Sequence, residues 1–215
     1  MKPATAPAPS LRAFTVALLR EWGGDRYGSR ISVSSPCWPA KSVPATVTLS
    51  GVPVAFPVGG FLQATEDGEA ALVESVRECV SGPVADLFAG LGTFALATRA
   101  AYSAEASRDA AAALKQAAPA MTVEHRDLYR RPLDRTELDR FETVILDPPR
   151  AGANEQVRQL SASAVGKLAY VSCNPATFAR DARTLADGGY RLSWVRPVGQ
   201  FRWSTHVELA ACFTR

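Results

Sequence analysis

Short apolar runs alternate with amphipathic stretches over most of the chain beyond residue 83. The apolar runs have the length of buried strands, and the stretches between them carry apolar residues at helical spacing. The pattern predicts strands at 83–88, 101–104, 121–125, 142–146, 168–172, 190–197 and 206–213. It predicts helices between them, at 91–99, 107–117, 153–163 and 175–187. Such alternation indicates an α/β fold with a mostly parallel seven-stranded sheet and helices on both faces.

The two ends of the chain depart from this alternation. The strands at 190–197 and 206–213 have no helix between them, which predicts an antiparallel last strand. Upstream, a helix is predicted at 66–80, and alternating apolar residues on either side of Gly51 predict a hairpin. The remaining predictions are a disordered Pro/Ala-rich leader at 1–10, a helix at 11–22 and an irregular linker at 24–42. We therefore expect residues 11–58 to form a small helix/hairpin appendage and 59–215 to form the main domain.

Composition sets only broad limits on the class of protein and its partners. The 215 residues are 47% apolar and 21% charged, which is typical of a globular protein, and no apolar run is long enough to span a bilayer. A net charge of +3 is too small to indicate a nucleic-acid partner, although the arginines are concentrated in the second half. No membrane contact and no obligate protein partner are expected.

The cysteine pattern argues against a metal centre. Cys37, Cys79, Cys173 and Cys212 are widely separated and form no CxxC pair, so neither a zinc ribbon nor an iron–sulfur cluster is expected. We expect reduced thiols and a cytoplasmic protein.

The first strand of the predicted sheet leads into a glycine turn. Asp86-Leu87-Phe88-Ala89-Gly90-Leu91-Gly92-Thr93-Phe94 combines a buried strand, two glycines and the start of a helix. Glycines allow unusual dihedral angles and close approach of a ligand, and the helix start offers free N–H groups. A bare strand-to-helix turn is equally compatible with this stretch. NAD-dependent oxidoreduction is disfavoured because the third glycine of the dinucleotide fingerprint is absent.

Polar residues follow the other predicted strands, at the edge where ligands bind in open α/β sheets. Glu105 ends the second strand and is placed either for ribose hydroxyls or as a solvated charge. Asp127 follows the third, for an adenine amino group or for capping. The fourth ends in Asp147-Pro148-Pro149-Arg150, where two prolines fix a rigid extended loop. Such rigidity favours the wall of an active site.

Two residues near the end of the chain carry potential reaction chemistry. Cys173 follows an apolar strand and precedes a proline that begins a helix. A helix N-terminus favours a thiolate, so catalysis is preferred over a role as a small core residue. Glu208 lies between apolar residues of the last strand, where burial is costly unless the carboxylate is used. An outward-facing position is the alternative.

Taken together, these stretches resemble the motifs of the RNA uracil-C5 methyltransferases. The resemblance covers about residues 51 to 215 and lies in Asp86–Phe94, Asp147–Arg150, Ser172-Cys173-Asn174-Pro175 and His206-Val207-Glu208. Gly60-Phe61-Leu62-Gln63 also resembles the family's cofactor-contacting glutamine loop. The resemblance implies a Rossmann-like class I methyltransferase domain at 59–215 that forms 5-methyluridine in RNA, in ribosomal RNA before transfer RNA, with S-adenosylmethionine as cofactor.

The resemblance also assigns roles to individual residues. Cys173 would add to carbon 6 of the uracil and Glu208 would remove the carbon-5 proton. The uridine must leave its stack, so a loop or single-stranded RNA is the expected partner. The cofactor positions are Gln63, Phe88, Gly90, Gly92, Thr93, Glu105, Asp127 and Asp147, of which Asp147 also suits the uracil edge. The substrate positions are Pro148, Pro149, Arg150 and Asn174.

Two departures from the family pattern leave alternatives open. The family's N-terminal RNA-binding barrel and iron–sulfur motif are not visible, so a silent RNA- or cofactor-binding module remains an alternative. The segment from Phe94 to Glu105 is a few residues shorter than in the family, which affects the assignment of Glu105. Amino-methyltransferases also use an Asp-Pro-Pro loop without a cysteine, although they follow it with an aromatic residue where this chain has Arg150.

Overall fold

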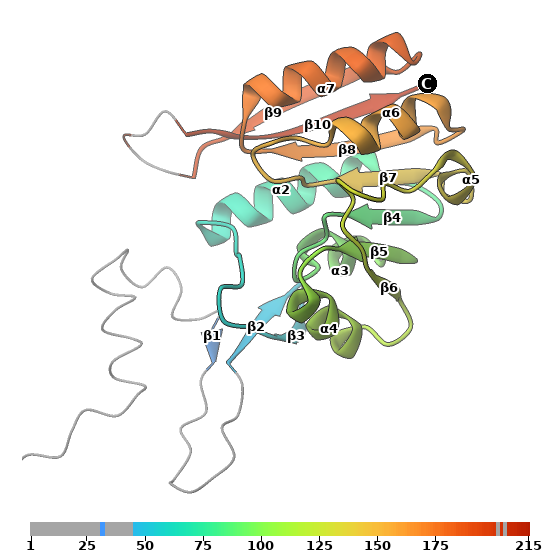
Figure 1. Ribbon diagram of the computed structural model, residues 1–215. Coiled ribbons are helices and arrows are strands. Elements are labelled where there is room, and N and C mark those ends of the chain that lie inside the picture. The colour runs from blue at the N-terminus through green and yellow to red at the C-terminus, as the bar shows by residue number, and fades with distance from the viewer. Residues whose placement is uncertain (1–30, 33–44, 201–202, 204–205) are drawn as a thin grey trace, which may run out of the picture.

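Seven strands form the central sheet of the computed structural model, which describes residues 31–32, 45–200, 203 and 206–215 (Figure 1). The strand order is β6-β5-β4-β7-β8-β10-β9. β4 to β8 pair in parallel, and β10 is antiparallel to both β8 and β9. The strands are β4 (Val84–Leu87), β5 (Tyr102–Glu105), β6 (Thr122–His125), β7 (Thr143–Leu146), β8 (Lys167–Ser172), β9 (Arg191–Val198) and β10 (Glu208–Thr214). The predicted seven-stranded sheet with an antiparallel last strand is confirmed.

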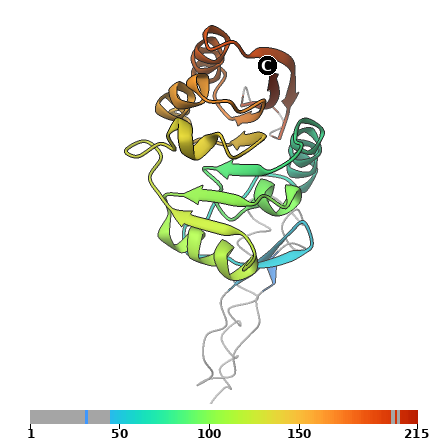
Figure 2. The same ribbon diagram turned by 90° about the vertical axis from the view of Figure 1, so that its right-hand side faces the viewer.

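Helices cover both faces of this sheet (Figure 2). One core contains residues of α2, α3 and α4, and the other contains residues of α5, α6 and α7. The helices are α2 (Glu66–Cys79), α3 (Thr93–Thr98), α4 (Arg108–Ala117), α5 (Arg135–Leu138), α6 (Asn154–Ala162) and α7 (Pro175–Asp187). All except α5 were predicted. α5 is too short for a periodic pattern, and a capping box between Asp134 and Glu137 stabilises it.

The predicted hairpin is present as β2 (Thr46–Leu49) and β3 (Val52–Ala55). Ser50 and Gly51 form its turn with φ values of 48° and 84°. β1 (Ile31–Ser32) pairs with β2, so the expected irregular linker at 24–42 was wrong at these two residues. The inner face of the hairpin packs against α4 and Leu91 of the glycine turn, which couples it to the main domain. The leader at 1–10 and the helix at 11–22 lie outside the described residues.

The expectation of fully reduced thiols was wrong. Cys79 of α2 and Cys212 of β10 form a disulfide, with their Cα atoms 5.7 Å apart. The two are 133 positions apart in the sequence, so their spacing gave no indication of this contact. Cys173 is the free cysteine among the described residues, and Cys37 lies outside them. None of the described helices has the length and apolar character needed to cross a membrane.

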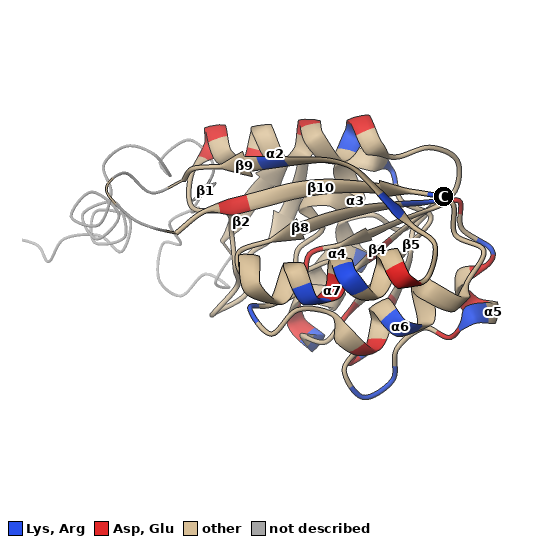
Figure 3. Ribbon diagram, turned by 90° about the horizontal axis from the view of Figure 1, so that it is seen from above, with Lys and Arg blue, Asp and Glu red and all other residues tan. Residues whose placement is uncertain are grey.

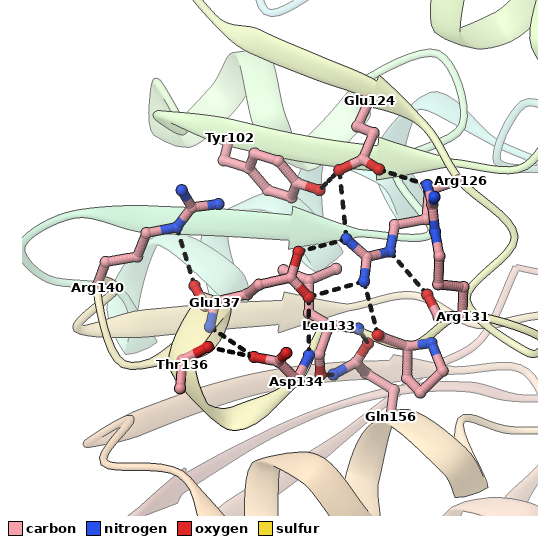
Figure 4. A network of polar contacts seen from close by, with 11 residues as sticks. Tyr102, Glu124, Arg126, Arg131, Leu133, Asp134, Thr136, Glu137, Arg140 and Gln156 are labelled. Carbon is pink, nitrogen blue, oxygen red and sulfur yellow. Dashed lines mark hydrogen bonds and ion pairs between the residues drawn. The ribbon is translucent and has the colours of Figure 1, made fainter.

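The arginines of the second half are largely paired with acids, and blue and red segments are interspersed on the helices in Figure 3. Arg126 is the most buried of those that the structure describes, and it donates to both carboxylate oxygens of Glu137, at 2.6 and 2.8 Å (Figure 4). It also donates to the carbonyls of Arg131 and Pro132, both at 2.7 Å. Further ion pairs involve Arg130, Arg131, Arg135, Arg158, Arg180, Arg183 and Arg196. The arginine-rich half is therefore weak evidence for an anionic partner.

Candidate active site

A cavity of about 470 Å³ opens at the carboxyl ends of β4, β5, β7 and β8. The loop at 59–63 and the start of β10 complete its wall. This is the edge of the sheet where the strand order reverses, next to β4 and β7, and it is the place predicted for a ligand. Eleven of the fourteen predicted site residues line it: Gln63, Phe88, Gly90, Thr93, Glu105, Asp147, Pro148, Pro149, Arg150, Cys173 and Glu208.

The glycine turn forms the floor of the cavity with a strained backbone. Phe88 has a φ of 64°, which is rare for a residue with a bulky side chain and is often found at functional sites. A Cβ added to Gly90 would meet nothing within 4 Å, so its backbone faces open space. Gly92 does not line the cavity. A Cβ there would lie 2.4 Å from Leu114 Cδ1, so Gly92 permits close packing of α3 on α4.

Glu105 holds this turn from the neighbouring strand. Its Oε2 accepts a hydrogen bond from the Gly90 N–H at 2.8 Å, and its Oε1 accepts one from the Ser107 N–H at 2.6 Å. The carboxylate thus joins the ends of β4 and β5. Each oxygen retains a further lone pair, which is what a ribose hydroxyl needs. The ribose assignment of Glu105 stays a prediction.

Asp127 does not line the cavity, whereas its neighbours Leu128 and Tyr129 do. Asp127 Oδ1 accepts the Tyr129 N–H at 2.9 Å, which fits the capping alternative. The Tyr129 hydroxyl donates to the Gly152 carbonyl at 3.0 Å, and its ring lies 5.6 Å from that of Phe88. Sequence reasoning missed Tyr129, although an aromatic residue soon after a strand end was a usable signal.

Asn174 is also absent from the lining, but it fixes the Asp-Pro-Pro-Arg loop. Its Oδ1 caps α7 by accepting the Ala176 N–H at 3.1 Å. Its Nδ2 donates to the Arg150 carbonyl at 2.9 Å. On the far side of the loop, buried Asp181 accepts the Ala153 N–H at 2.7 Å. Hydrogen bonds with several side chains thus hold the loop and the residues that follow it, in agreement with the predicted rigid wall.

Sheet register brings Cys173 and Glu208 to the same place. β10 runs antiparallel to β8 with Leu209 opposite Ser172. The next pair beyond this end of the ladder is Glu208 and Cys173, and both line the cavity. The two residues are thus neighbours in space through one strand pairing.

Carboxyl groups dominate the electrostatics of the cavity. Burial, followed by the charges of Glu208 and Glu105, raises the pKa of Asp147 to about 7. Burial also raises the pKa of Glu208, against the opposing effect of Arg150. Asp86 is fully buried beneath the turn, and burial and the charge of Asp147 raise its pKa well above the ordinary value. A site with this excess of acids favours a cationic ligand.

The thiol of Cys173 is not activated in the way the sequence suggested. Its position immediately before the N-cap of α7 is confirmed. However, burial raises the pKa of this thiol, and the charges of Glu208 and Asp147 raise it further, while Arg150 opposes them. The expected preference for the thiolate was therefore wrong for the ligand-free protein, because burial and two carboxylates outweigh the helix end.

The buried carboxyl of Asp147 gives a testable pH dependence of stability. Because its pKa is raised from 3.8 to about 7, the folded protein binds more protons than the unfolded chain between these values. The free energy of unfolding contributed by this group therefore falls as pH rises from about 4 to 7. We expect Asp147→Asn to be more stable than the wild type at pH 8, by on the order of 2–4 kcal/mol, with no such advantage near pH 4.

Urea unfolding at the two pH values measures this difference. Asp134→Asn is a control of opposite sign, because hydrogen bonds from Thr136 and Glu137 lower the pKa of the Asp134 carboxyl. That variant should be less stable than the wild type at both pH values, because the lowered pKa of Asp134 places the loss of its contribution below about pH 4. If Asp147→Asn changed the free energy of unfolding by the same amount at both pH values, this result would contradict the raised pKa of Asp147.

The chain is similar in sequence to proteins named as RNA methyltransferases. Residues 107–215 match the family model described as tRNA (Uracil-5-)-methyltransferase. A protein of Zymomonas mobilis named as an uncharacterized RNA methyltransferase is 57% identical over 187 residues, which cover 83% of this chain and 47% of that protein. The 23S rRNA (uracil(1939)-C(5))-methyltransferase RlmD of Pseudomonas savastanoi is 34% identical over 74% of this chain and 39% of its own length. The chain spans about half the length of these relatives or less.

Solved structures show the same fold. The Pyrococcus abyssi tRNA (uracil-54, C5)-methyltransferase in complex with S-adenosyl-L-homocysteine superposes with a TM-score of 0.68 at 26% identity. The match covers 85% of this chain and 49% of that one. M. jannaschii TYW2 in complex with AdoMet gives a TM-score of 0.55 at 15% identity, which supports the fold alone.

Proposed function

The chain belongs to the RNA uracil-C5 methyltransferase family, and from this premise we propose that it methylates carbon 5 of a uridine in RNA. The main support is that the glycine turn, the Asp-Pro-Pro-Arg loop, Cys173 and Glu208 all line one cavity. An amino-methyltransferase would need neither the cysteine nor the acid opposite it. A cofactor-binding module without catalysis would need no free thiol in the cavity.

The residues present fit S-adenosylmethionine as the cofactor. The cavity offers a volume of about 470 Å³, open backbone at Gly90 and an excess of carboxyl groups that suits a sulfonium cation. When bound, the cofactor supplies an electrophilic methyl group. The residues that would hold it are Gln63, Phe88, Gly90, Thr93, Glu105 and Asp147.

Carbon 5 of uracil is a weak nucleophile, and Cys173 would activate it by adding to carbon 6. The thiol first gives its proton to a carboxylate, for which Asp147 is suited because its pKa of about 7 matches neutral solution. The sulfur then bonds to carbon 6, and the electrons of the carbon 5–carbon 6 double bond move to carbon 5 and its carbonyl. Carbon 5 thereby becomes able to accept a methyl group.

Glu208 would complete the reaction. After methylation, carbon 5 still carries its original proton, and the Glu208 carboxylate removes it. The double bond re-forms as the bond between carbon 6 and sulfur breaks, and the thiolate leaves. The position of Glu208 opposite Cys173 supports this division of roles, because one residue must act at carbon 6 and the other at carbon 5.

Ribosomal RNA is the preferred substrate of this proposal. It is supported by the 34% identity to a 23S rRNA methyltransferase, against 26% to a tRNA methyltransferase. The uridine would be taken from a loop or single strand, because its ring must enter the cavity. In this proposal, residues 59–215 form the methyltransferase domain, and the protein acts on its RNA in the cytoplasm.

Isothermal titration calorimetry with S-adenosylhomocysteine tests the cofactor part of this proposal. We expect saturable binding with one site per chain, and weaker binding when Thr93 or Glu105 is replaced by alanine. Replacement of Asp109, an exposed acid on α4 outside the cavity lining, should leave the affinity unchanged. The absence of detectable binding by the wild-type chain would overturn both methyltransferase readings.

A further inference from the structure

Two buried glutamines meet at one side of the cavity. Gln63 belongs to the loop before α2 and lines the cavity, whereas Gln200 follows β9 and does not. Their exposed fractions are 5% and 6%. The Gln200 Nε2 group donates a hydrogen bond to Gln63 Oε1 at 2.9 Å, although the two residues are 137 positions apart. Gln200 therefore touches the cavity only through Gln63.

A backbone group sets the direction of this hydrogen bond. The N–H of Thr65, the N-cap residue of α2, donates to Gln200 Oε1 at 3.2 Å. A backbone N–H can only donate, so the Gln200 atom that it contacts must be the oxygen. The other end of the Gln200 amide is then the NH₂ group, and the Gln63 atom that accepts from it must be Oε1. The Gln63 NH₂ group takes no part in this hydrogen bond, and Gln63 is the one of the two glutamines that lines the cavity.

Gly68 leaves room for the Gln200 side chain in this position. A Cβ added to Gly68 would lie 2.5 Å from Gln200 Cγ and 2.7 Å from its Cδ. Glycine is otherwise unfavourable inside a helix such as α2. Its presence in the first turn therefore fits a requirement for space beneath the Gln200 side chain. Thr65, Gly68, Gln200 and Gln63 form one chain of contacts from the start of α2 to the cavity.

Resting on the proposed function, we propose that Gln200 is a positioning residue that fixes the orientation of the Gln63 amide. Gln63 then presents a hydrogen-bond donor to an oxygen acceptor of the bound cofactor. Without Gln200, the Gln63 amide is free to turn and to present its carbonyl oxygen, which would repel the same acceptor. Gln200 thus acts on cofactor affinity through Gln63 and touches neither the cofactor nor the reacting atoms.

Replacing Gln200 by glutamate reverses the hydrogen-bond direction with little change in shape. One glutamate oxygen accepts the Thr65 N–H, and the other requires a donor, which Gln63 supplies by turning its NH₂ group away from the cavity. We expect the affinity for S-adenosylhomocysteine at pH 8 to fall about tenfold or more. Gln200→Met removes both the donor to Gln63 and the acceptor of the Thr65 N–H, and it imposes no reversed hydrogen bond on Gln63. It should therefore cause a smaller loss, of about threefold.

Gln156 provides the matched control. It is also a buried glutamine whose Oε1 accepts a backbone N–H, from Leu133 at 2.8 Å, but it lies away from the cavity. Gln156→Glu should lower the stability of the fold and leave the affinity unchanged. In a Gln63→Ala background, Gln200→Glu should have no further effect on affinity, because Gln63 is the residue through which Gln200 acts.

NMR of the ligand-free protein gives a readout that does not depend on binding. The Gln200 side-chain NH₂ signals should exchange slowly with water, and those of Gln63 should exchange fast. The inference is overturned if the Gln63 NH₂ group is the protected one, if Gln200→Glu and Gln200→Met both keep wild-type affinity, or if the loss persists in Gln63→Ala. Absence of binding by the wild type, with the expected NMR pattern, would overturn the proposed cofactor and leave the amide orientation established.

Discussion

A Cys173→Ser variant is expected to form no covalent complex with RNA and to methylate uridine at least about a thousandfold more slowly than the wild type. The serine hydroxyl has nearly the shape of the thiol but is a far weaker acid and nucleophile. Addition to carbon 6 therefore fails, and carbon 5 is never activated. The thiol itself lies on the cavity wall, where burial and then the charges of Glu208 and Asp147 raise its pKa.

Mass spectrometry with RNA that contains 5-fluorouridine measures the adduct directly. Fluorine at carbon 5 prevents proton removal, so the wild type should remain bound to the RNA through Cys173 in the presence of cofactor. Cys173→Ser should show no mass increase and should still bind S-adenosylhomocysteine, which separates lost chemistry from lost folding. Methylation by Cys173→Ser at a rate close to that of the wild type would refute covalent catalysis and favour the amino-methyltransferase alternative.

A Glu208→Gln variant is expected to accumulate a covalent complex with unmodified uridine RNA. Glutamine occupies the same space but cannot accept the carbon-5 proton, so the methylated adduct cannot break down. Loss of the general base should slow turnover by about 10²- to 10⁴-fold. Adduct formation itself should not be slowed, because removing the Glu208 charge lowers the pKa of Cys173 toward its ordinary value.

Gel electrophoresis under denaturing conditions resolves this complex from free protein. Glu78→Gln is the control, because Glu78 is an exposed acid of α2 that pairs with Arg196 far from the cavity lining. It should turn over like the wild type and leave no complex. If Glu208→Gln yields product at the wild-type rate, another group removes the proton. If it yields neither product nor complex, Glu208 acts before the adduct forms.

The local sequence was sufficient for the elements that carry the site. Apolar runs and helical spacing predicted all seven strands of the sheet and the helices around it except the short α5, because burial on one or both faces leaves a periodic pattern. The glycine turn, the two prolines after Asp147 and the proline after Asn174 restrict the backbone within a few residues. These features act over short distances, so they can be read from neighbouring residues.

Tertiary structure decided which of these features act together. β10 enters the sheet antiparallel to β8 and places Glu208 opposite Cys173, and no local pattern specifies that pairing. The disulfide between Cys79 and Cys212 and the contact between Gln63 and Gln200 likewise join segments more than 130 positions apart. The sequence predicted a lowered pKa for the Cys173 thiol, whereas the pKa is raised. This shift depends on burial and on two carboxylates from other strands.

The sequence by itself therefore determined the strand-and-helix order and the residue types that reach the carboxyl edge of the sheet. The folded structure alone decided the size of the cavity, the raised pKa values of its acids and the orientation of the Gln63 amide. The physical reason is the range of the interactions. Backbone preferences and amphipathic patterns are local, whereas desolvation, charge coupling and hydrogen-bond direction depend on groups that only folding brings together.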